Sequence, residues 1–364
     1  MALQKGESFI DCDVHQQTKS PRDLFPYLPK AYQERIELFG TGLTQRAGYP
    51  NGGDRGWRAD SWGDDGSNPC SDIEMLREKH LNVYNIEYVI LQGQEYRPIP
   101  SLPDADYAAA LARAYNDWMI EHWIEQDERV KGLAIIPTQN PQLAAKELER
   151  VGTHPGIVGA LVPNGARVPY GQRFYDPIFE VCVGLDLPFV IHTGSEGDTS
   201  VGQASYYIEH RQGRALAMQA HLASMVFEGL FERYPTLRVA CVEAGYTWLP
   251  TFLWRMDADW KALGRETPWV KRAPSEYILE HCRFTSQPME SPEPVRRLLT
   301  VFEWAKAEQT LMFASDYPHF DFDSPEQSLP PLPDETRHRI FSENARELFK
   351  LPKRTVTPTA AVAD

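Results

Sequence analysis

Short apolar runs rich in Val, Ile and Phe recur along the chain, and most of them end in polar or turn-forming residues and lead into a stretch with helical periodicity. Apolar runs of this length, without alternating polar positions, are typical of parallel strands that are buried on both faces. Eight such runs are predicted as strands: residues 8–15, 86–93, 130–138, 157–164, 187–194, 238–245, 282–288 and 310–319.

Between these runs, apolar positions repeat with the period of a helix at residues 105–126, 141–151, 209–233, 247–263 and 292–306. Asn140 before Pro141, and Asp176 before Pro177, are typical helix starts with a capping side chain and proline in the first turn. Strands that alternate with helices eight times predict an α/β fold, the (β/α)8 TIM barrel. A doubly wound open sheet is the alternative if one or two of the runs are not strands.

The length of 364 residues and the hydrophobic content of 42% allow one large core, so residues 1–351 are expected to form a single barrel domain. Residues 40–70 interrupt the rhythm after the first strand, where a barrel carries active-site loops. This inserted loop region holds Arg55, Trp57, Arg58 and Trp62, and it is expected either to remain a flexible surface loop or to cover the site or contact a partner subunit. Residues 352–364 are expected to be a flexible C-terminal tail.

The formal net charge is −14 and no block of Lys or Arg is present, which argues against nucleic acid or an anionic membrane as a partner. A small-molecule substrate, a cytoplasmic location and a homodimer are expected. The five cysteines are scattered without a CxxC pair, so they are predicted as small core residues, with neither a disulfide framework nor a structural zinc site.

Acidic residues and histidines gather at the ends of the predicted strands, the end at which a barrel holds its active site. They are Asp13, His15, His192, Glu243, Asp316 and His319. Taken one by one, these residues have ordinary alternatives, such as a core histidine at His192, a turn residue at Asp13 or a helix cap at Asp316. Together they indicate a catalytic metal site, because imidazole nitrogens and carboxylate oxygens are the ligands of Zn, Mn and Fe.

The sequence also resembles the amidohydrolase-related family, which includes the aminocarboxymuconate-semialdehyde decarboxylase-like enzymes of the amidohydrolase superfamily. The resemblance covers nearly the whole chain and rests on FIDCDVH, DPIFEVCVGLDLPFVIHTG, GLFERYPTLRVACVEAGYTWLPTFLWRMD, HCRFTSQP and LMFASDYPHFDFDSP, in this order. It implies a metal-bearing (β/α)8 barrel in which Asp13, His15, His192 and Asp316 bind one divalent ion.

Two departures from the family pattern change what the resemblance implies. Asp13 stands where many relatives have a histidine, and the added negative charge makes a harder ligand set, so zinc is the first expectation with manganese or iron as alternatives. Glu243 stands where the decarboxylases usually place a catalytic histidine, which puts their mechanism in doubt for this chain.

Roles follow for the remaining polar residues near the strand ends. Asp316, Glu243 and His192 are predicted as catalytic, with Glu243 serving either as a proton carrier or as a support for a ligand histidine. The predicted substrate-binding residues are His319, Arg211, Arg214, Asn164 and Trp62.

Hydrolysis of an amide, lactone or related bond by a metal-activated water is the predicted reaction, because a negative Glu243 would repel a substrate carboxylate. The alternatives are a non-oxidative decarboxylase of a small aromatic or unsaturated acid and a metal-assisted condensation or cyclisation with loss of water. A metal-free binding barrel is the alternative from another class, and the many ionisable strand-end groups argue against it.

Overall fold

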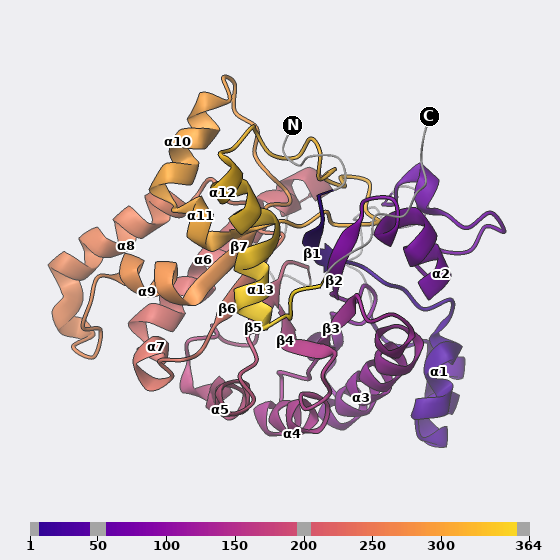
Figure 1. Ribbon diagram of the computed structural model, residues 1–364. Helices are drawn as coiled ribbons and strands as arrows, with labels where there is room; N and C mark the ends of the chain where they lie inside the picture. Colours follow the sequence, from indigo (N-terminus) through magenta and orange to yellow (C-terminus); the bar gives the residue numbers. More distant parts are fainter. Residues whose placement is uncertain (1–6, 44–55, 195–204, 355–364) are drawn as a thin grey trace.

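The structure is a computed structural model that describes residues 7–43, 56–194 and 205–354 (Figure 1). At its centre, each strand pairs in parallel with the next one along the chain. The strands are β1 (Phe9–Val14), β2 (Ile86–Leu91), β3 (Val130–Ile135), β4 (Ile157–Pro163), β5 (Phe189–His192), β6 (Val239–Val242), β7 (Cys282–Thr285) and β8 (Leu311–Met312). All eight predicted strands are confirmed, in the predicted order.

The first and last strands meet and close the sheet. The backbone N–H of Cys12 donates to the carbonyl of Phe313 (3.1 Å), that of His15 donates to Tyr317 (2.8 Å), and Val14 pairs in parallel with Tyr317. The predicted (β/α)8 barrel is therefore confirmed, and the doubly wound open sheet is excluded.

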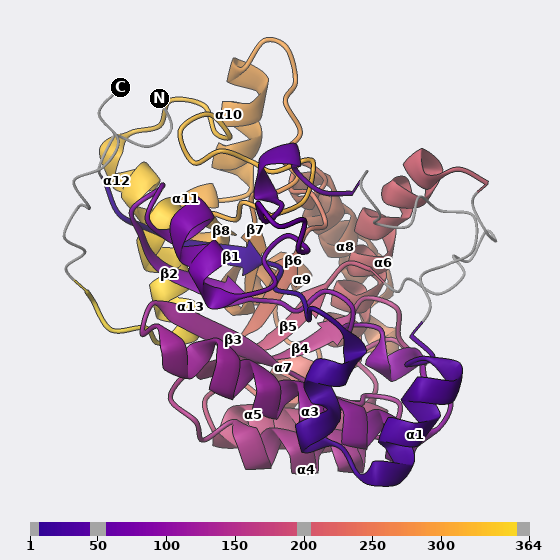
Figure 2. The ribbon, with the colours of Figure 1, turned by 90° about the vertical axis from the view of Figure 1, so that its right-hand side faces the viewer.

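Helices surround the strands, and α3, α4 and α5 follow one another along the outside of the barrel (Figures 1 and 2). The helices are α1 (Lys30–Phe39), α2 (Ile73–Leu76), α3 (Ala105–His122), α4 (Pro141–Val151), α5 (Asp176–Gly184), α6 (Tyr207–Phe227), α7 (Leu230–Arg233), α8 (Leu249–Leu263), α9 (Pro274–His281), α10 (Arg296–Trp304), α11 (Ala307–Thr310), α12 (Asp334–His338) and α13 (Asn344–Phe349).

Lys306, the last residue of the predicted helix 292–306, has φ +52° and separates α10 from α11, a short helix that was not predicted. Gly229, with φ +69°, breaks the predicted helix 209–233 into α6 and α7. A left-handed residue ends the hydrogen-bond ladder of a helix, and the apolar periodicity continues across such a break, so periodicity alone did not locate it.

The two predicted helix starts differ in detail. Asn140 caps α4 as predicted, since its side chain accepts a hydrogen bond from the N–H of Leu143 (3.2 Å) and Pro141 is the first helical residue. Asp176, by contrast, is the first residue of α5 and makes no cap, because its carboxylate accepts a hydrogen bond from Arg233 (3.0 Å).

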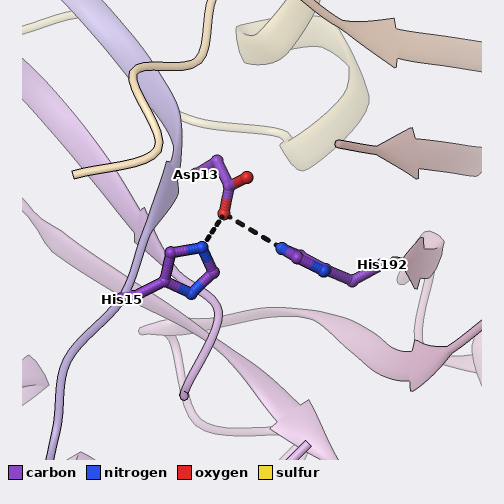
Figure 3. A group of neighbouring side chains, drawn as sticks. All are labelled: Asp13, His15 and His192. Atoms are coloured by element: carbon purple, nitrogen blue, oxygen red, sulfur yellow. Dashed lines mark hydrogen bonds and ion pairs between the residues drawn. The ribbon is translucent and has the colours of Figure 1, made fainter. Parts of the chain in front are cut away.

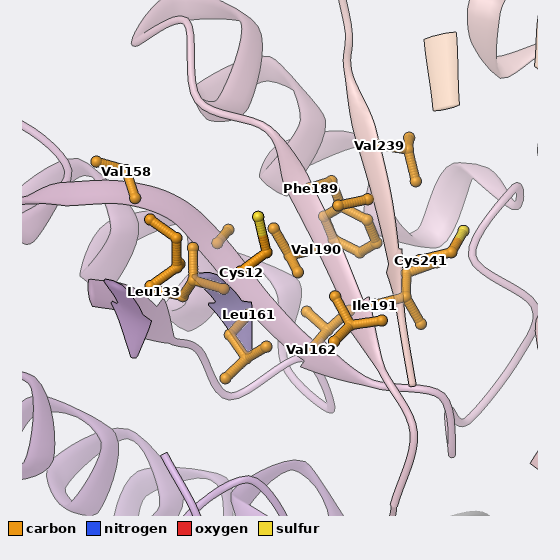
Figure 4. Close-up of a cluster of buried hydrophobic side chains, with 14 of the residues drawn as sticks. Cys12, Leu133, Val158, Leu161, Val162, Phe189, Val190, Ile191, Val239 and Cys241 are labelled. Carbon is orange, nitrogen blue, oxygen red and sulfur yellow. The ribbon is translucent and has the colours of Figure 1, made fainter. Parts of the chain in front are cut away.

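Side chains from several strands fill the barrel with an apolar core (Figure 4). Every residue of β1, β2 and β4 is buried, which explains why these strands appear as continuous apolar runs in the sequence. The five cysteines are free and buried, among them Cys12 and Cys241 in this cluster, so their prediction as core residues is confirmed.

The inserted loop region, residues 40–70, is described at 40–43 and 56–70. Its residues 57 and 58 lie along the loop that follows β8. Trp57 pairs with His319 in an isolated antiparallel bridge, and the N–H of Arg58 donates to the carbonyl of Pro318 (3.0 Å). Residues 44–55, which include Arg55, lie outside the described residues. So do residues 355–364 of the predicted tail, whereas the N–H of Arg354 donates to Glu87 (2.9 Å).

Candidate active site

The carboxyl ends of β1, β5 and β8 bring the predicted metal ligands together. Nε2 of His15 lies 3.0 Å from Oδ1 of Asp13 and 2.9 Å from Oδ1 of Asp316, and Nε2 of His192 lies 3.3 Å from the same oxygen of Asp13 (Figure 3). Asp13, His15 and His192 are fully buried. Side chains from strands far apart in the sequence thus converge on one point at the predicted end of the barrel.

His15 is held so that one ring nitrogen faces the two carboxylates. Its Nδ1 donates to the carbonyl of Gly93 (2.9 Å), and a carbonyl accepts only, so the lone pair of the neutral ring lies on Nε2. Nε2 of His15 contacts the two carboxylates, and Oδ2 of Asp13 is a buried atom without a hydrogen-bond partner. A histidine that donates one N–H to a carbonyl and aims the other nitrogen at carboxylates has the arrangement of a metal ligand.

The electrostatics of this group favour a cation at Nε2 of His15. Burial opposes the charged ring, but the Asp13 carboxylate outweighs it and raises the pKa of His15 to about 10. Burial likewise opposes ionisation of Asp13 and Asp316, yet the neighbouring histidines hold the pKa of each carboxyl well below its usual range. A site that binds a proton this firmly between two carboxylates also suits a metal ion in its place.

Each of three overlapping sets could hold a metal ion, with its ligand atoms within 4.8 Å of one another. The sets are Asp13, His15 and His192; His15, Asp316 and His319; and Asp13, Glu243 and Asp316. Two imidazoles and two carboxylates at one buried point fit the chemistry of a divalent ion.

His192 contacts an arginine that the sequence analysis did not single out. Nη1 of Arg97 lies 2.5 Å from Nδ1 and 2.8 Å from Nε2 of His192, while Nη2 donates to Gln94 (3.1 Å). Burial and the Arg97 charge both lower the pKa of His192, so the ring is neutral, the form that binds metals. Arg97 lies four residues after the end of the predicted strand 86–93. A search for charged residues in the loops that follow the strands, and not only at the strand ends, would have found it.

Glu243 occupies the end of β6, and its charge is paired. Arg214 donates from Nη1 to one carboxylate oxygen, and Thr193 donates from Oγ1 to the other (2.9 Å). Nε2 of His192 lies 3.8 Å from this second oxygen. The carboxylate therefore lies beside the predicted metal ligands with a guanidinium group on its far side.

His319 lies between the predicted ligands and the inserted loop region. Its Nδ1 is 2.5 Å from Oδ1 of Asp316, and one of its neighbours is the ring of His15, at 4.5 Å between centroids. The indole of Trp57 stacks on the same imidazole at 5.0 Å and 10°. His319 is thus fixed by aromatic contacts and linked directly to Asp316.

The other predicted substrate-binding residues are placed differently. Arg211 donates to Asp321 (2.5 Å) in the loop after β8. Asn164 is buried, its N–H donates to the carbonyl of His192 (2.8 Å), and neither side-chain amide atom has a partner. Trp62 accepts at its carbonyl from Lys79 (2.6 Å), and among the residues that the structure describes no hydrogen bond joins its indole to the ligand cluster.

Comparisons with known proteins agree with this geometry. Residues 10–351 match the profile of the family described as amidohydrolase. The chain belongs to this family. Among curated proteins, the chain is 28% identical over 306 residues to a gamma-resorcylate decarboxylase of Polaromonas sp. strain JS666. The match covers 77% of this chain and 88% of the relative.

Two solved structures have a fold similar to that of this chain over nearly its whole length. The 2,6-dihydroxybenzoate decarboxylase from Rhizobium has a TM-score of 0.68 at 22% identity and covers 94% of this chain and 99% of that one. The dihydroxybenzoic acid decarboxylase from Polaromonas sp. JS666, solved with manganese and the inhibitor 2-nitroresorcinol, has a TM-score of 0.66 at 22% identity and covers 96% and 98%. The predicted family resemblance and barrel are confirmed.

The prediction of an enzyme of this superfamily is confirmed, but the predicted hydrolysis is wrong. Curated relatives that match about three quarters of this chain are decarboxylases. Glu243 is no obstacle to a substrate carboxylate, because the Arg214 guanidinium pairs with it and balances its charge. Zinc is not confirmed, and the Polaromonas structure carries manganese. No helix among the described residues combines the length and apolar character that a membrane span requires.

Proposed function

We propose that the chain is a metal-dependent, non-oxidative decarboxylase of a hydroxylated aromatic carboxylic acid. The relatives named above act on such acids according to their names, gamma-resorcylate and 2,6-dihydroxybenzoate. The observation that carries the proposal is the pairing of Glu243 with Arg214, because it removes the obstacle to an anionic substrate.

The charge balance of the site supports a substrate with one carboxylate. The three carboxylates Asp13, Asp316 and Glu243 and the two guanidinium groups Arg97 and Arg214 leave one negative charge when the histidines are neutral. A divalent ion changes this to one net positive charge. Because buried charge must be compensated, a monoanionic substrate completes the balance.

Asp13, His15, His192 and Asp316 would hold the divalent ion. When bound, the ion supplies Lewis acidity and a binding point for the carboxylate and its neighbouring hydroxyl oxygen. We propose manganese, because two carboxylates among four ligands make a hard donor set and because the structure from Polaromonas contains it.

Two residues outside the metal ligands would orient the substrate. The guanidinium group of Arg97 lies at the ring of His192, where two of its N–H groups can bind the two oxygens of the substrate carboxylate. Asn164 has both amide atoms buried and unpartnered one residue after β4, so a substrate hydroxyl would satisfy an otherwise costly group.

Asp316 and His319 would deliver the proton. The bond between the ring carbon and the carboxyl carbon breaks, carbon dioxide leaves, and the ring carbon takes a proton that the Asp316–His319 pair has gained from solvent, in addition to the one that a neutral His319 donates to Asp316. The side chain of His319 is 15% exposed, which gives the pair a route to recover a proton from solvent.

The test is turnover by the manganese-loaded protein of gamma-resorcylate and of 5-carboxyvanillate, the acid in the name of another decarboxylase of similar fold, from Sphingomonas paucimobilis. We expect release of carbon dioxide from at least one of them, loss of activity on chelation, and one deuterium on the product ring when the reaction runs in heavy water. A manganese-loaded, folded protein that releases no carbon dioxide from any ortho-hydroxybenzoate would contradict the proposal.

A further inference from the structure

The second carboxylate of β1, Asp11, is fully buried beside the metal-ligand cluster, and no step of the proposed reaction uses it. Its Oδ1 accepts from the backbone N–H of Ser315 (2.9 Å) and of Asp13 (3.3 Å). Its Oδ2 accepts from the hydroxyl of Ser315 (2.6 Å) and from Nε2 of His80 (2.8 Å). All four bonds come from within the protein, so Asp11 is satisfied without a ligand.

These bonds join the two chain segments that carry the carboxylate ligands. Asp13 follows Asp11 by two residues, and Asp316 follows Ser315 directly. The backbone N–H of Asp316 also donates to the carbonyl of Asp13 (3.1 Å). Asp11 therefore connects β1 to the loop after β8 at the point where both present a carboxylate to the same imidazole, His15.

His80 holds Asp11 from outside the barrel. It lies in a π-helical turn, Arg77–Leu81, and its ring stacks on that of Tyr317 at 4.3 Å and 7°. The N–H of Tyr317 in turn donates to the hydroxyl of Ser315 (3.1 Å). The residue that follows Asp316 is thus fixed by the same network.

We infer that Asp11 is a positioning residue that sets the spacing of Asp13 and Asp316 and thereby the metal affinity of the site. The two ligand carboxylates carry like charges and repel each other, so their spacing depends on bonds that hold their backbones together. Groups that orient metal ligands commonly contribute about 10- to 100-fold in affinity. The inference rests on the metal site of the proposed function.

The test is the affinity of the chelator-stripped chain for Mn²⁺, followed by the electron paramagnetic resonance signal of the free ion. Asp11→Asn keeps the size of the side chain, but its amide places N–H groups against donors, and we expect affinity to fall about 10- to 100-fold. Excess Mn²⁺ should restore most of the turnover, which a collapsed site would not allow.

Glu87→Gln is the matched control. Glu87 is also a buried carboxylate on a barrel strand with several donors, Arg346 among them, but it stands near the start of β2, away from the strand ends. Its substitution should cost stability and leave Mn²⁺ affinity within about twofold.

Two further variants keep the inference testable if Asp11→Asn does not fold. Ser315→Ala removes one donor to Asp11 and should weaken Mn²⁺ binding about tenfold, and His80→Gln, which keeps an N–H donor, should bind more tightly than His80→Ala. Wild-type affinity in a folded Asp11→Asn or Ser315→Ala chain overturns the inference alone. A wild-type chain that binds no Mn²⁺ overturns the proposed metal site and the inference with it.

Discussion

Asp316 after β8 and Glu243 after β6 are both buried carboxylates at strand ends, and both have left-handed backbone, with φ +61° and +58°. Such conformations cost about 1–3 kcal/mol in side chains other than glycine and persist where a site requires them. Their partners differ: Asp316 faces the imidazoles of His15 and His319, whereas Glu243 faces Arg214 and a hydroxyl.

The difference teaches that residue type and position do not define the role of a strand-end carboxylate. Asp316 can exchange a proton or bind a metal, because its neighbours are groups that do the same. Glu243 is electrically balanced by a guanidinium that keeps its charge at any working pH. The four predictions that follow test this contrast.

The largest effect is expected for Asp316→Asn. It removes the proposed proton carrier and a metal ligand, so turnover should fall about 10²- to 10⁴-fold with the fold retained. Carbon dioxide release and thermal melting are the measurements. Asp323→Asn is the control in the same loop, because burial raises the pKa of Asp323 to about 7 and the amide resembles its protonated form. Wild-type turnover in Asp316→Asn would remove Asp316 from the mechanism.

The second prediction concerns Arg214→Gln, which leaves Glu243 buried and unpaired. The uncompensated negative charge of Glu243 should raise KM for an aromatic carboxylate about 10- to 100-fold and lower thermal stability. Adding Glu243→Gln removes the charge again, so the double variant should bind substrate better than Arg214→Gln alone.

Glu243→Gln by itself separates the two roles predicted for this residue. If Glu243 carries a proton, the variant should lose about 10²-fold in turnover and keep its metal. If Glu243 supports His192, the variant should lose about 10- to 100-fold in metal affinity.

If the double variant with Arg214→Gln and Glu243→Gln binds substrate no better than Arg214→Gln alone, charge pairing is not what distinguishes Glu243.

The third prediction is a pH dependence on the Asp316 side of the comparison. Because the pKa of His15 in the metal-free chain is raised to about 10, an entering ion must displace its proton. Apparent Mn²⁺ affinity should therefore rise about tenfold per pH unit from neutral pH and level off near pH 10, with one proton released per ion. Calorimetry in buffers of different ionisation enthalpy measures the release, and affinity that is constant between pH 7 and 9 would contradict it.

The smallest effect is expected for Trp57→Ala. The indole stacks on His319, so its loss should loosen the Asp316–His319 pair and lower turnover about two- to tenfold while Mn²⁺ affinity stays unchanged. Trp304→Ala is the control, since that side chain is 52% exposed on α10. Equal turnover in both variants would show that the inserted loop region does not act on the site.

The fold was predictable because each barrel strand is covered on both faces. β1 and β4 are buried along their whole length and therefore read as apolar runs, and their polar ends mark the site. The break at Gly229 was not predictable, since a single left-handed residue leaves the apolar period intact.

The site was predictable only at the carboxyl ends of the predicted strand runs, on the strand or just after it. Asp13, His15 and Asp316 follow from the strand-end rule, but the pairing of Glu243 with Arg214 joins residues 29 apart on separate elements, and no local pattern encodes it. Asp11 carried a signal that was not used: it precedes Asp13 and His15 with the same spacing of two residues.

The contact between β1 and the segment that begins with β8, which closes the barrel, affects when the protein can fold during its synthesis. Asp11 and Ser315 are separated by 304 residues, so one half of the ligand set leaves the ribosome well before the other. The first strand has no neighbour on one edge until the last strand arrives. Uptake of Mn²⁺ by nascent chains stalled before and after residue 316 should therefore report when the ring of strands closes.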